Sequence, residues 1–196
     1  FAWTASSHGV LKHSAGNDAR TSVAWLPPEG TPGDMTLFFR NEYLSDLIGF
    51  EYAKWHGRDA AQHFMTELKA LHLQDSRNLI PVFLDGENAW EYYPHNAWYF
   101  FSALYESLAR NPAIRTLTLS EAATSQHDRR VRLPRLTAGS WVYGTLSTWI
   151  GNADKNRAWE MLCDIKQCAD RALDSGRLDA AAQAEVIRRL SICESS

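Results

Sequence analysis

The chain has 196 residues, of which 45% are hydrophobic and 22% are charged, and its formal net charge is −3. This composition predicts a folded, soluble chain with one sizeable core and excludes an intrinsically disordered one. The slight negative charge gives no electrostatic reason to expect nucleic acid or an anionic membrane as a partner, and no segment approaches the ~20 apolar residues of a membrane-spanning helix.

The first 34 residues are expected to be mostly connecting loop after a short opening strand. Residues 1–4 have the pattern of a strand, and glycine and proline recur through residues 9–33. Residues 35–39 are the second strand candidate. Because the sequence begins without Met and within a strand-like segment, we expect it to be a piece of a longer protein.

Two helices are predicted after the second strand. Asn41 is a plausible N-cap, and Leu44, Leu47 and Ile48 follow the three-four spacing of a buried helix face. The next helix is predicted over residues 59–73.

The most informative segment covers residues 79–94. Its apolar beginning, residues 79–84, has the pattern of a buried strand that ends at Asp85. Glu87 and Trp90 follow at once, so carboxylates and an aromatic ring gather where a strand would stop. In α/β proteins ligands bind at the carboxyl ends of the strands, and we therefore interpret this segment as the functional centre.

The remaining elements of the predicted sheet imply a cluster of charges. A helix over residues 97–110 and a strand over residues 114–119 complete βαβ units, which predict a parallel sheet. The strand ends would then bring together four charged residues, Arg40, Asp85, Glu87 and Glu121. Such a set either binds a ligand or forms a structural ion-pair network. We expect Arg40 to pair with Glu87 or Glu121, because pairing with Asp85 would oppose an acid role for that residue.

The last third of the chain begins with a polar segment, residues 122–139, which is expected to be a loop with its basic run of arginines solvated. Trp141 and Trp149 follow beside glycines. The two terminal helices are predicted over residues 154–173 and 179–192, beginning at Asp154 and Asp179 as plausible N-caps.

Three cysteines, Cys163, Cys168 and Cys193, lie in the last quarter of the chain. Their odd number and the lack of a C-x-x-C pair argue against a disulfide framework and a zinc site. We expect buried or partly buried thiols on helices and a reducing compartment, the cytoplasm. The seven histidines show no ligand spacing such as H-E-x-x-H, so neither a metal nor a cofactor is expected.

Carboxylates among aromatic residues suggest a carbohydrate site, since aromatic faces stack on sugar rings and carboxylates bind hydroxyl groups. Glycoside cleavage needs two carboxyl groups, about 5–5.5 Å apart for retention and about 6.5–9.5 Å apart for inversion. Asp85 is the candidate general acid, and spacing alone does not choose its partner. Trp90, Trp141 and Trp149 are candidate stacking residues. Three further tryptophans, Trp25, Trp55 and Trp98, are expected to be packing residues.

Residues 83–94, FLDGENAWEYYP, closely resemble the acid-bearing motif of glycoside hydrolase family 57. Residues 38–50, FFRNEYLSDLIGF, and then residues 119–121 and 139–159 are similar to stretches of the alpha-amylase-like branch of that family, in the same order. The resemblance covers nearly the whole chain up to about residue 162.

The resemblance implies the C-terminal portion of an incomplete (β/α)7 barrel with parallel strands, followed by an α-helical segment. We accordingly predict two domains, a partial barrel with the acid-bearing loop over residues 1–138 and an aromatic loop with the terminal helices over residues 139–196.

The resemblance also implies that Asp85 is the general acid/base of a retaining double displacement on α-linked glucans or maltooligosaccharides. The expected substrate-binding residues are Arg40, Glu87, Trp90, Glu121, Trp141 and Trp149. The family's nucleophile is a Glu in a Trp-Pro-x-Glu-Gly motif, which this sequence lacks, and residues 1–11 resemble the segment just downstream of it. The isolated chain is therefore expected to be inactive.

Two functional hypotheses follow. The first is part of a hydrolase or glucanotransferase, of the α-amylase or 4-α-glucanotransferase type. The second is a noncatalytic carbohydrate-binding relic of the same fold. The sequence leaves open hydrolysis against transglycosylation, because both proceed through the same glycosyl-enzyme intermediate. It also leaves open the glucan length and the oligomeric state.

Overall fold

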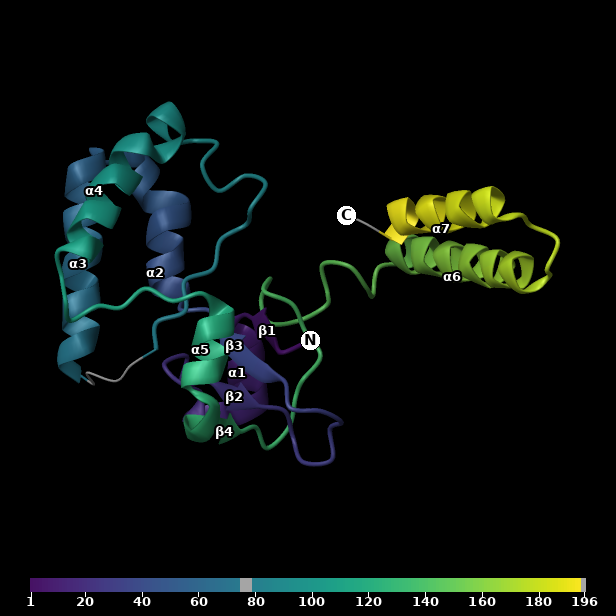
Figure 1. Cartoon of the computed structure of the whole chain (residues 1–196), viewed down its shortest axis with the longest axis horizontal. Helices are drawn as coiled ribbons and strands as arrows, with labels where there is room; N and C mark the ends of the chain where they lie inside the picture. Colours follow the sequence, from purple (N-terminus) through teal and green to yellow (C-terminus); the bar gives the residue numbers. More distant parts are fainter. Residues whose placement is uncertain (75–78, 195–196) are drawn as a thin grey trace. The chain divides into compact units, whose positions relative to one another are not determined.

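The computed structural model describes residues 1–74 and 79–194. It divides into two compact units, Phe1–Thr145 and Leu146–Ser196 (Figure 1). The domain boundary predicted between residues 138 and 139 stays a prediction. In the described part of the chain, no helix is long and apolar enough to cross a membrane.

The first unit is built on a four-stranded sheet of order β1-β3-β2-β4. Its strands are β1 (Trp3–Ser6), β2 (Trp25–Leu26), β3 (Thr36–Phe39) and β4 (Val131–Arg132). The pairs β1–β3 and β2–β4 are parallel, whereas β2 and β3 are antiparallel. The strands predicted at residues 1–4 and 35–39 are confirmed within two residues, and the fold is a mixed α/β structure with a mostly parallel sheet.

Helices cover both faces of this sheet. Leu37 and its neighbours pack on one face against α1 (His8–Ala15), and Phe38 packs on the other face against α5 (Leu119–Ser125). Successive side chains of a strand point to opposite faces, so the apolar run of β3 is buried on both. Full burial of a side chain of this size contributes roughly 1.5–3 kcal/mol.

A helical layer with a hydrophobic core of its own belongs to the same unit. It consists of α2 (Glu42–Asp46), the π-helical turn η2 (Leu47–Glu51), η3 (Tyr52–Lys54), α3 (Gly57–Gln74) and α4 (Trp98–Ala109). Tyr52, Phe64 and Phe100 meet at its centre. Asn41 caps α2 as predicted, its Oδ1 accepting from the backbone N–H of Leu44.

Two predicted strands are absent from the described residues. Residues 79–84 form no strand, because Pro81 has no N–H to donate and the neighbouring backbone groups bond singly to different partners. Residues 114–119 form none either. Thr118 instead caps α5, in a reciprocal capping box with Glu121.

The first unit also contains regular structure in segments expected to be loops. These elements are α1, β2, α5, β4 and the short helices η1 (Gly16–Asp18) and η5 (His127–Arg129). One further short helix, η4 (Pro94–Ala97), leads into α4.

The second unit is a helical hairpin of α6 (Ala153–Asp174) and α7 (Ala180–Glu194), close to the predicted bounds. Asn152, not Asp154, is the N-cap of α6, and Asp179 Oδ1 accepts from the N–H of Ala182 at the start of α7. The three cysteines lie on these helices, but they are exposed, which corrects the expectation of buried thiols.

Candidate active site

The C-terminal ends of β1 and β3 lie side by side because the two strands are parallel and in register, with Ser6 opposite Phe39. His8 follows β1 and Glu42 follows β3, and His8 Nδ1 lies 3.7 Å from Glu42 Oε2. Arg40 comes directly after β3. This strand-end surface is the place where an α/β fold presents its ligand-binding loops.

Residues 79–94, here called the acid-bearing segment, are fixed to this surface although they form no strand. The N–H of Asn41 donates to Pro81 O at 2.8 Å, and the N–H of Phe83 donates to Ser45 Oγ at 3.3 Å. Arg40 Nε donates to Phe83 O at 3.0 Å. Three hydrogen bonds within three residues therefore set where the chain leaves for Asp85.

Arg40 acts on the backbone and not on the predicted carboxylates. Its side chain is 13% exposed, and Nη2 donates to Asp46 Oδ1 at 2.7 Å. The predicted pairing with Glu87 or Glu121 is wrong, because Asp46 on the adjoining helix lies closer along the chain. Its position explains how the segment is held, whereas a role in substrate binding stays a prediction.

Asp85 and Glu87 are both exposed. Among residues 1–74 and 79–194, neither carboxylate takes part in a hydrogen bond or ion pair. Asp85 follows an apolar segment, but its side chain is exposed to solvent in this structure. Both groups are available to a ligand, and their assignment as catalytic and substrate-binding residues stays a prediction.

Trp90 anchors the far end of the acid-bearing segment. Its ring lies edge to face against Phe101 on α4, with centroids 4.4 Å apart, and 5.7 Å from the ring of Tyr93. Tyr93 Oη donates to the backbone oxygen of Ile48, and burial raises the pKa of Tyr93 to about 12. Trp90 is partly buried, so packing engages a large part of its ring.

The carboxylate of Glu121 forms hydrogen bonds within the N-terminal cap of its own helix, α5. Its carboxylate accepts from the N–H and the Oγ1 of Thr118, both at 2.8 Å, and these bonds lower the pKa of Glu121. Trp3 Nε1 donates to Ser120 Oγ, which places this helix start beside the beginning of β1. The strand-end argument for Glu121 is therefore wrong, and its role in substrate binding stays a prediction without that support.

A loop over residues 139–145 docks on the strand-end surface, a contact that the sequence did not reveal. Ser7 Oγ donates to Ser140 O at 3.1 Å, just past the end of β1. The backbones of Gly9 and Gly144 touch, since a Cβ on Gly144 would lie 2.6 Å from the carbonyl carbon of Gly9. Gly9 and Gly144 are the sequence signal from which this contact could have been predicted, because residues without a Cβ allow two backbones to touch. Trp141 on this loop is exposed.

Trp149 belongs to the second unit. Its ring is partly exposed, and its backbone oxygen accepts from Trp159 Nε1 at 3.0 Å. This bond joins the turn before α6 to the helix itself. Substrate stacking by Trp149 stays a prediction.

Glu29 offers the nearest approach in this sequence to the nucleophile motif, within Pro27-Pro28-Glu29-Gly30. It follows β2, which runs antiparallel to β3. Glu29 therefore leaves the sheet at the end opposite to Arg40 and the acid-bearing segment. The strand direction thus places Glu29 away from the strand-end surface.

The described residues of the first unit line hollows of different size. A cavity of about 390 Å³ lies along β1, β3 and residues 136–139, and an open groove of about 810 Å³ lies between α3 and α4. Asp85 and Glu87 line neither of them. Within the described residues there is also no group of three or more His, Cys, Asp or Glu side chains that could hold a metal ion.

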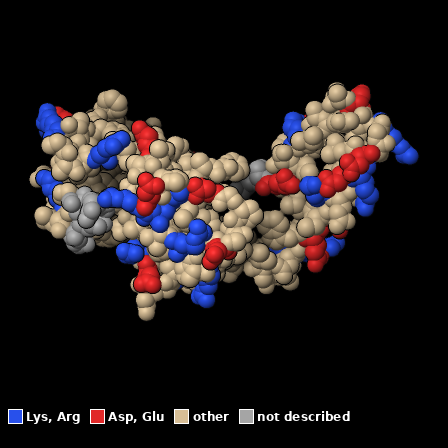
Figure 2. Space-filling view, turned by 60° about the horizontal axis from the view of Figure 1, so that its bottom comes forward, with Lys and Arg blue, Asp and Glu red and all other residues tan. Residues whose placement is uncertain are grey.

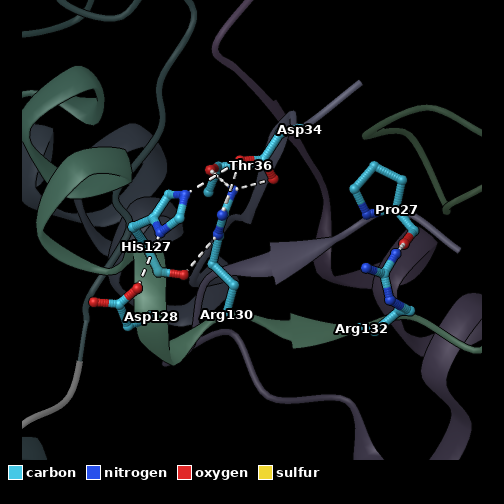
Figure 3. Close-up of polar contacts among 7 residues, drawn as sticks. All are labelled: Pro27, Asp34, Thr36, His127, Asp128, Arg130 and Arg132. Carbon is cyan, nitrogen blue, oxygen red and sulfur yellow. Dashed lines mark hydrogen bonds and ion pairs between the residues drawn. The ribbon is translucent and has the colours of Figure 1, made fainter. Parts of the chain in front are cut away.

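The N-terminal end of β3 carries a charge cluster of its own (Figure 3). Arg130 Nη1 lies 2.9 Å from Asp34 Oδ1 and donates to Thr36 Oγ1 at 3.2 Å, and the side chain is only 5% exposed. Arg132 Nη1 donates to Pro27 O. The expectation of a solvated basic run is wrong for Arg130, whose guanidinium binds groups about 95 residues earlier in the chain, whereas Arg129, Arg132 and Arg135 are exposed as expected.

The same cluster shifts two pKa values. The hydrogen bond from Arg130 is the main cause that lowers the pKa of Asp34. Hydrogen bonds to Asp128 and then to Asp34 raise the pKa of His127. On the face drawn in Figure 2, acidic and basic side chains are interspersed, as expected where charges pair locally.

Comparison with known proteins supplies the last observation. The model of the family described as Glycosyl hydrolase family 57 matches residues 2–135. The crystal structure of a GH57 branching enzyme from the hyperthermophilic archaeon Thermococcus kodakaraensis, in complex with glucose, is similar with a TM-score of 0.71 and 14% sequence identity. The similarity covers 88% of this chain and 40% of that one, so the chain spans less than half of the matched structure. No curated protein matches.

Proposed function

The chain belongs to glycosyl hydrolase family 57, and from this premise we propose that it forms part of a retaining enzyme that acts on α-linked glucans, with Asp85 as the general acid/base. The observation that carries the proposal is the exposed Asp85 on a segment that Arg40, Asn41 and Ser45 fix to the strand-end surface. We further propose that the sheet is the C-terminal part of an incomplete (β/α)7 barrel.

The chemistry would proceed in two steps. In the first, Asp85 donates its proton to the glycosidic oxygen while a carboxylate nucleophile attacks the anomeric carbon, which expels the leaving sugar and gives a glycosyl-enzyme ester. In the second, the Asp85 carboxylate takes a proton from water or from a sugar hydroxyl, whose oxygen attacks the anomeric carbon and releases the nucleophile. Two inversions retain the configuration.

The nucleophile is the part that these 196 residues do not supply. The Trp-Pro-x-Glu-Gly motif is missing from the sequence, and Glu29 leaves the sheet at the opposite end. We therefore propose that the isolated chain does not complete a double displacement.

Substrate binding at this surface is proposed to use Glu87 for hydroxyl groups and Trp141 for stacking. The dock of residues 139–145 on Ser7 and Gly9 supports a place for Trp141 at the end of β1, beside the end of β3. Arg40 is a positioning residue in this scheme, because it acts through the Phe83 backbone.

The acceptor in the second step separates hydrolysis from glucan transfer. The matched solved structure is described as a branching enzyme, which adds glucan branching to the transfer reactions under consideration. The second hypothesis, a noncatalytic carbohydrate-binding chain, is favoured by one observation, the missing nucleophile motif.

The test uses protein expressed from the complete reading frame that contains this chain. We expect it to turn over maltooligosaccharides and expect Asp85→Asn to lower kcat by about 10²–10⁴-fold. Glu87→Gln is the matched control two residues away, with a smaller loss that appears mainly in KM. Normal turnover by the isolated chain, abolished by Asp85→Asn, would contradict the proposal and point to a substitute nucleophile within these 196 residues.

A further inference from the structure

The turn between the acid-bearing segment and α4 has an unusual backbone. His95, Asn96 and Ala97 are three consecutive residues in the left-handed region, with φ of 52°, 51° and 61°. Residues other than glycine rarely adopt this conformation, and it costs roughly 1–2 kcal/mol per residue. Such strain persists only where the surrounding structure imposes it, and it occurs preferentially at functional sites.

Tight packing fixes the buried side of the turn. Ala97 is buried, and the N–H of Asn96 donates to Tyr93 O. Gly57, at the start of α3, lies so close to the start of α4 that a Cβ on it would be 2.7 Å from the backbone nitrogen of Phe100. The buried side of the turn is therefore fixed, and its remaining residues face outward.

The outward side presents exposed aromatic rings and side chains that can form hydrogen bonds. Trp98 is 67% exposed and Tyr99 is 57% exposed, so the expectation that Trp98 is a packing residue is wrong. The His95 ring lies edge to face against Tyr99, with centroids 5.4 Å apart. In the described part of the chain, neither the His95 ring nitrogens nor the Asn96 side chain has a hydrogen-bond partner. We call His95, Asn96, Trp98 and Tyr99 the turn patch.

The chemistry of the turn patch matches a sugar better than other ligands. Aromatic faces stack on the C–H faces of a pyranose, and amide and imidazole groups bind its hydroxyls. The patch contains no Lys or Arg with which to hold phosphates, so nucleic acid is a poor match. Its unpartnered polar groups would be left without hydrogen bonds under a wholly apolar protein surface.

We propose that the turn patch is a second binding site for α-linked glucan chains, separate from the residues around Asp85. The choice of α-linked glucan rests on the proposed function. Its role would be to hold a long substrate while a distant part of the same glucan reacts. The strained turn would serve this role by aiming His95 and Asn96 at the ligand beside the two rings.

The experiment measures binding and not turnover. Protein from the complete reading frame, carrying Asp85→Asn to prevent cleavage, is run by affinity electrophoresis through gels that contain amylose. We expect Trp98→Ala and Tyr99→Ala each to weaken retardation by about fivefold to tenfold in apparent Kd, as for an aromatic residue central to an interface. Trp98→Phe, which keeps a stacking face, should restore most of it.

The matched control is Tyr105→Ala. Tyr105 lies on the same helix, is 61% exposed and is outside the turn patch. It should leave retardation unchanged, and thermal melting should show that all variants fold. A β-linked glucan in the gel should retard none of the proteins.

The outcomes separate this inference from the proposed function. Unchanged retardation of Trp98→Ala and Tyr99→Ala beside a retarded parent would overturn the turn patch and leave the role of Asp85 untouched. Loss of retardation in those variants, together with full turnover by the Asp85→Asn protein, would uphold the patch and refute the catalytic assignment. Self-association that Trp98→Ala abolishes, without any change in amylose binding, would mean that a second copy occupies the patch and would overturn the glucan proposal.

Discussion

Asp34 and Asp85 belong to regions at opposite ends of β3 and differ in whether they are paired with a cation. Before the first residue of β3, Asp34 is paired with Arg130 and His127, and Arg130 is nearly inaccessible to solvent. Beyond its last residue, Asp85 and Glu87 are exposed, and within the described residues they have no partner. The strand has only four residues, so roughly 13 Å of backbone separates the two ends.

The difference follows the division of labour found in barrel folds, where the N-terminal ends of the strands serve stability and the C-terminal ends serve chemistry. An acidic residue that pairs with a cation stabilises the sheet and cannot bind a ligand at the same time. An acidic residue without a paired cation remains available to bind a ligand. Even Arg40, the cation beside the acid-bearing segment, is committed to Asp46 and to a backbone oxygen.

The largest loss of stability is expected on substitution of Arg130. Arg130→Ala removes hydrogen bonds to Asp34, Thr36 and the backbone of His127, and we expect a loss of about 2 kcal/mol in the free energy of unfolding. Asp85→Asn should change it by less than about 0.5 kcal/mol. Urea titrations of the two variants decide the matter, and equal losses would refute the division between the two ends.

A smaller effect is expected at Arg40. Arg40→Lys keeps a cation near Asp46 but loses the Nε–H that binds Phe83 O, and we expect a loss of about 1 kcal/mol. Hydrogen exchange should become faster at the N–H of Phe83. The control is Asp46→Asn, which removes the ion pair and keeps the bond to Phe83. If that control accelerates exchange equally, the ion pair and not the backbone bond holds the segment.

The strain in the turn after the acid-bearing segment predicts a gain. Ala97→Gly places glycine at φ 61°, where it fits without steric cost, and should stabilise the chain by about 0.5–1 kcal/mol. Ala109→Gly, in the right-handed last turn of α4, should instead destabilise it by a similar amount. Thermal melting of both variants provides the measurement, and a loss at both positions would mean that the turn is not strained.

The smallest effect concerns pH. The pKa of Asp34 is lowered from 3.8, so its contribution is present above that value and is lost as pH falls through the lowered pKa. The pKa of His127 is raised from 6.5, so its contribution is present below that value and is lost as pH rises through the raised pKa. The cluster should therefore stabilise the chain most between pH 3.8 and 6.5.

Melting temperatures of the parent and of His127→Gln, measured across this range, provide the check. Their difference should be largest near pH 5 and should shrink by pH 8. A difference that does not depend on pH would show that His127 acts by packing alone.

Local signals in the sequence were sufficient for several elements. The caps at Asn41 and Asp179 and the apolar run of β3 each act over a few residues, and the structure confirms them. The strand predicted at residues 114–119 does not form for an equally local reason, because the Thr118–Glu121 capping box outweighs a short alternation of apolar residues.

Other features depend on distant partners and could not be found in the same way. The environment of Arg130 is decided by Asp34, 96 residues away, and the loop that carries Trp141 is placed by a backbone contact between Gly9 and Gly144. For the candidate site, the motif around Asp85 was visible in the sequence. Its attachment to the residues after β3 was not, because Phe83 binds the side chains of Arg40 and Ser45, and hydrophobic periodicity does not predict such contacts.

Asn41 and Ser45 give the acid-bearing segment a dynamic property. Asn41 donates its N–H to Pro81, caps α2 through its side chain and accepts from Ser45, whose Oγ in turn receives the N–H of Phe83. Lifting the segment from the sheet therefore removes support from the first turn of α2. The two should open as one cooperative unit, with amide exchange at Leu44, Ser45 and Phe83 following a shared rate. We therefore expect the acid-bearing segment to open by local unfolding together with the first turn of α2. The stability of that helical turn would then set how often Asp85 moves away from the strand-end surface.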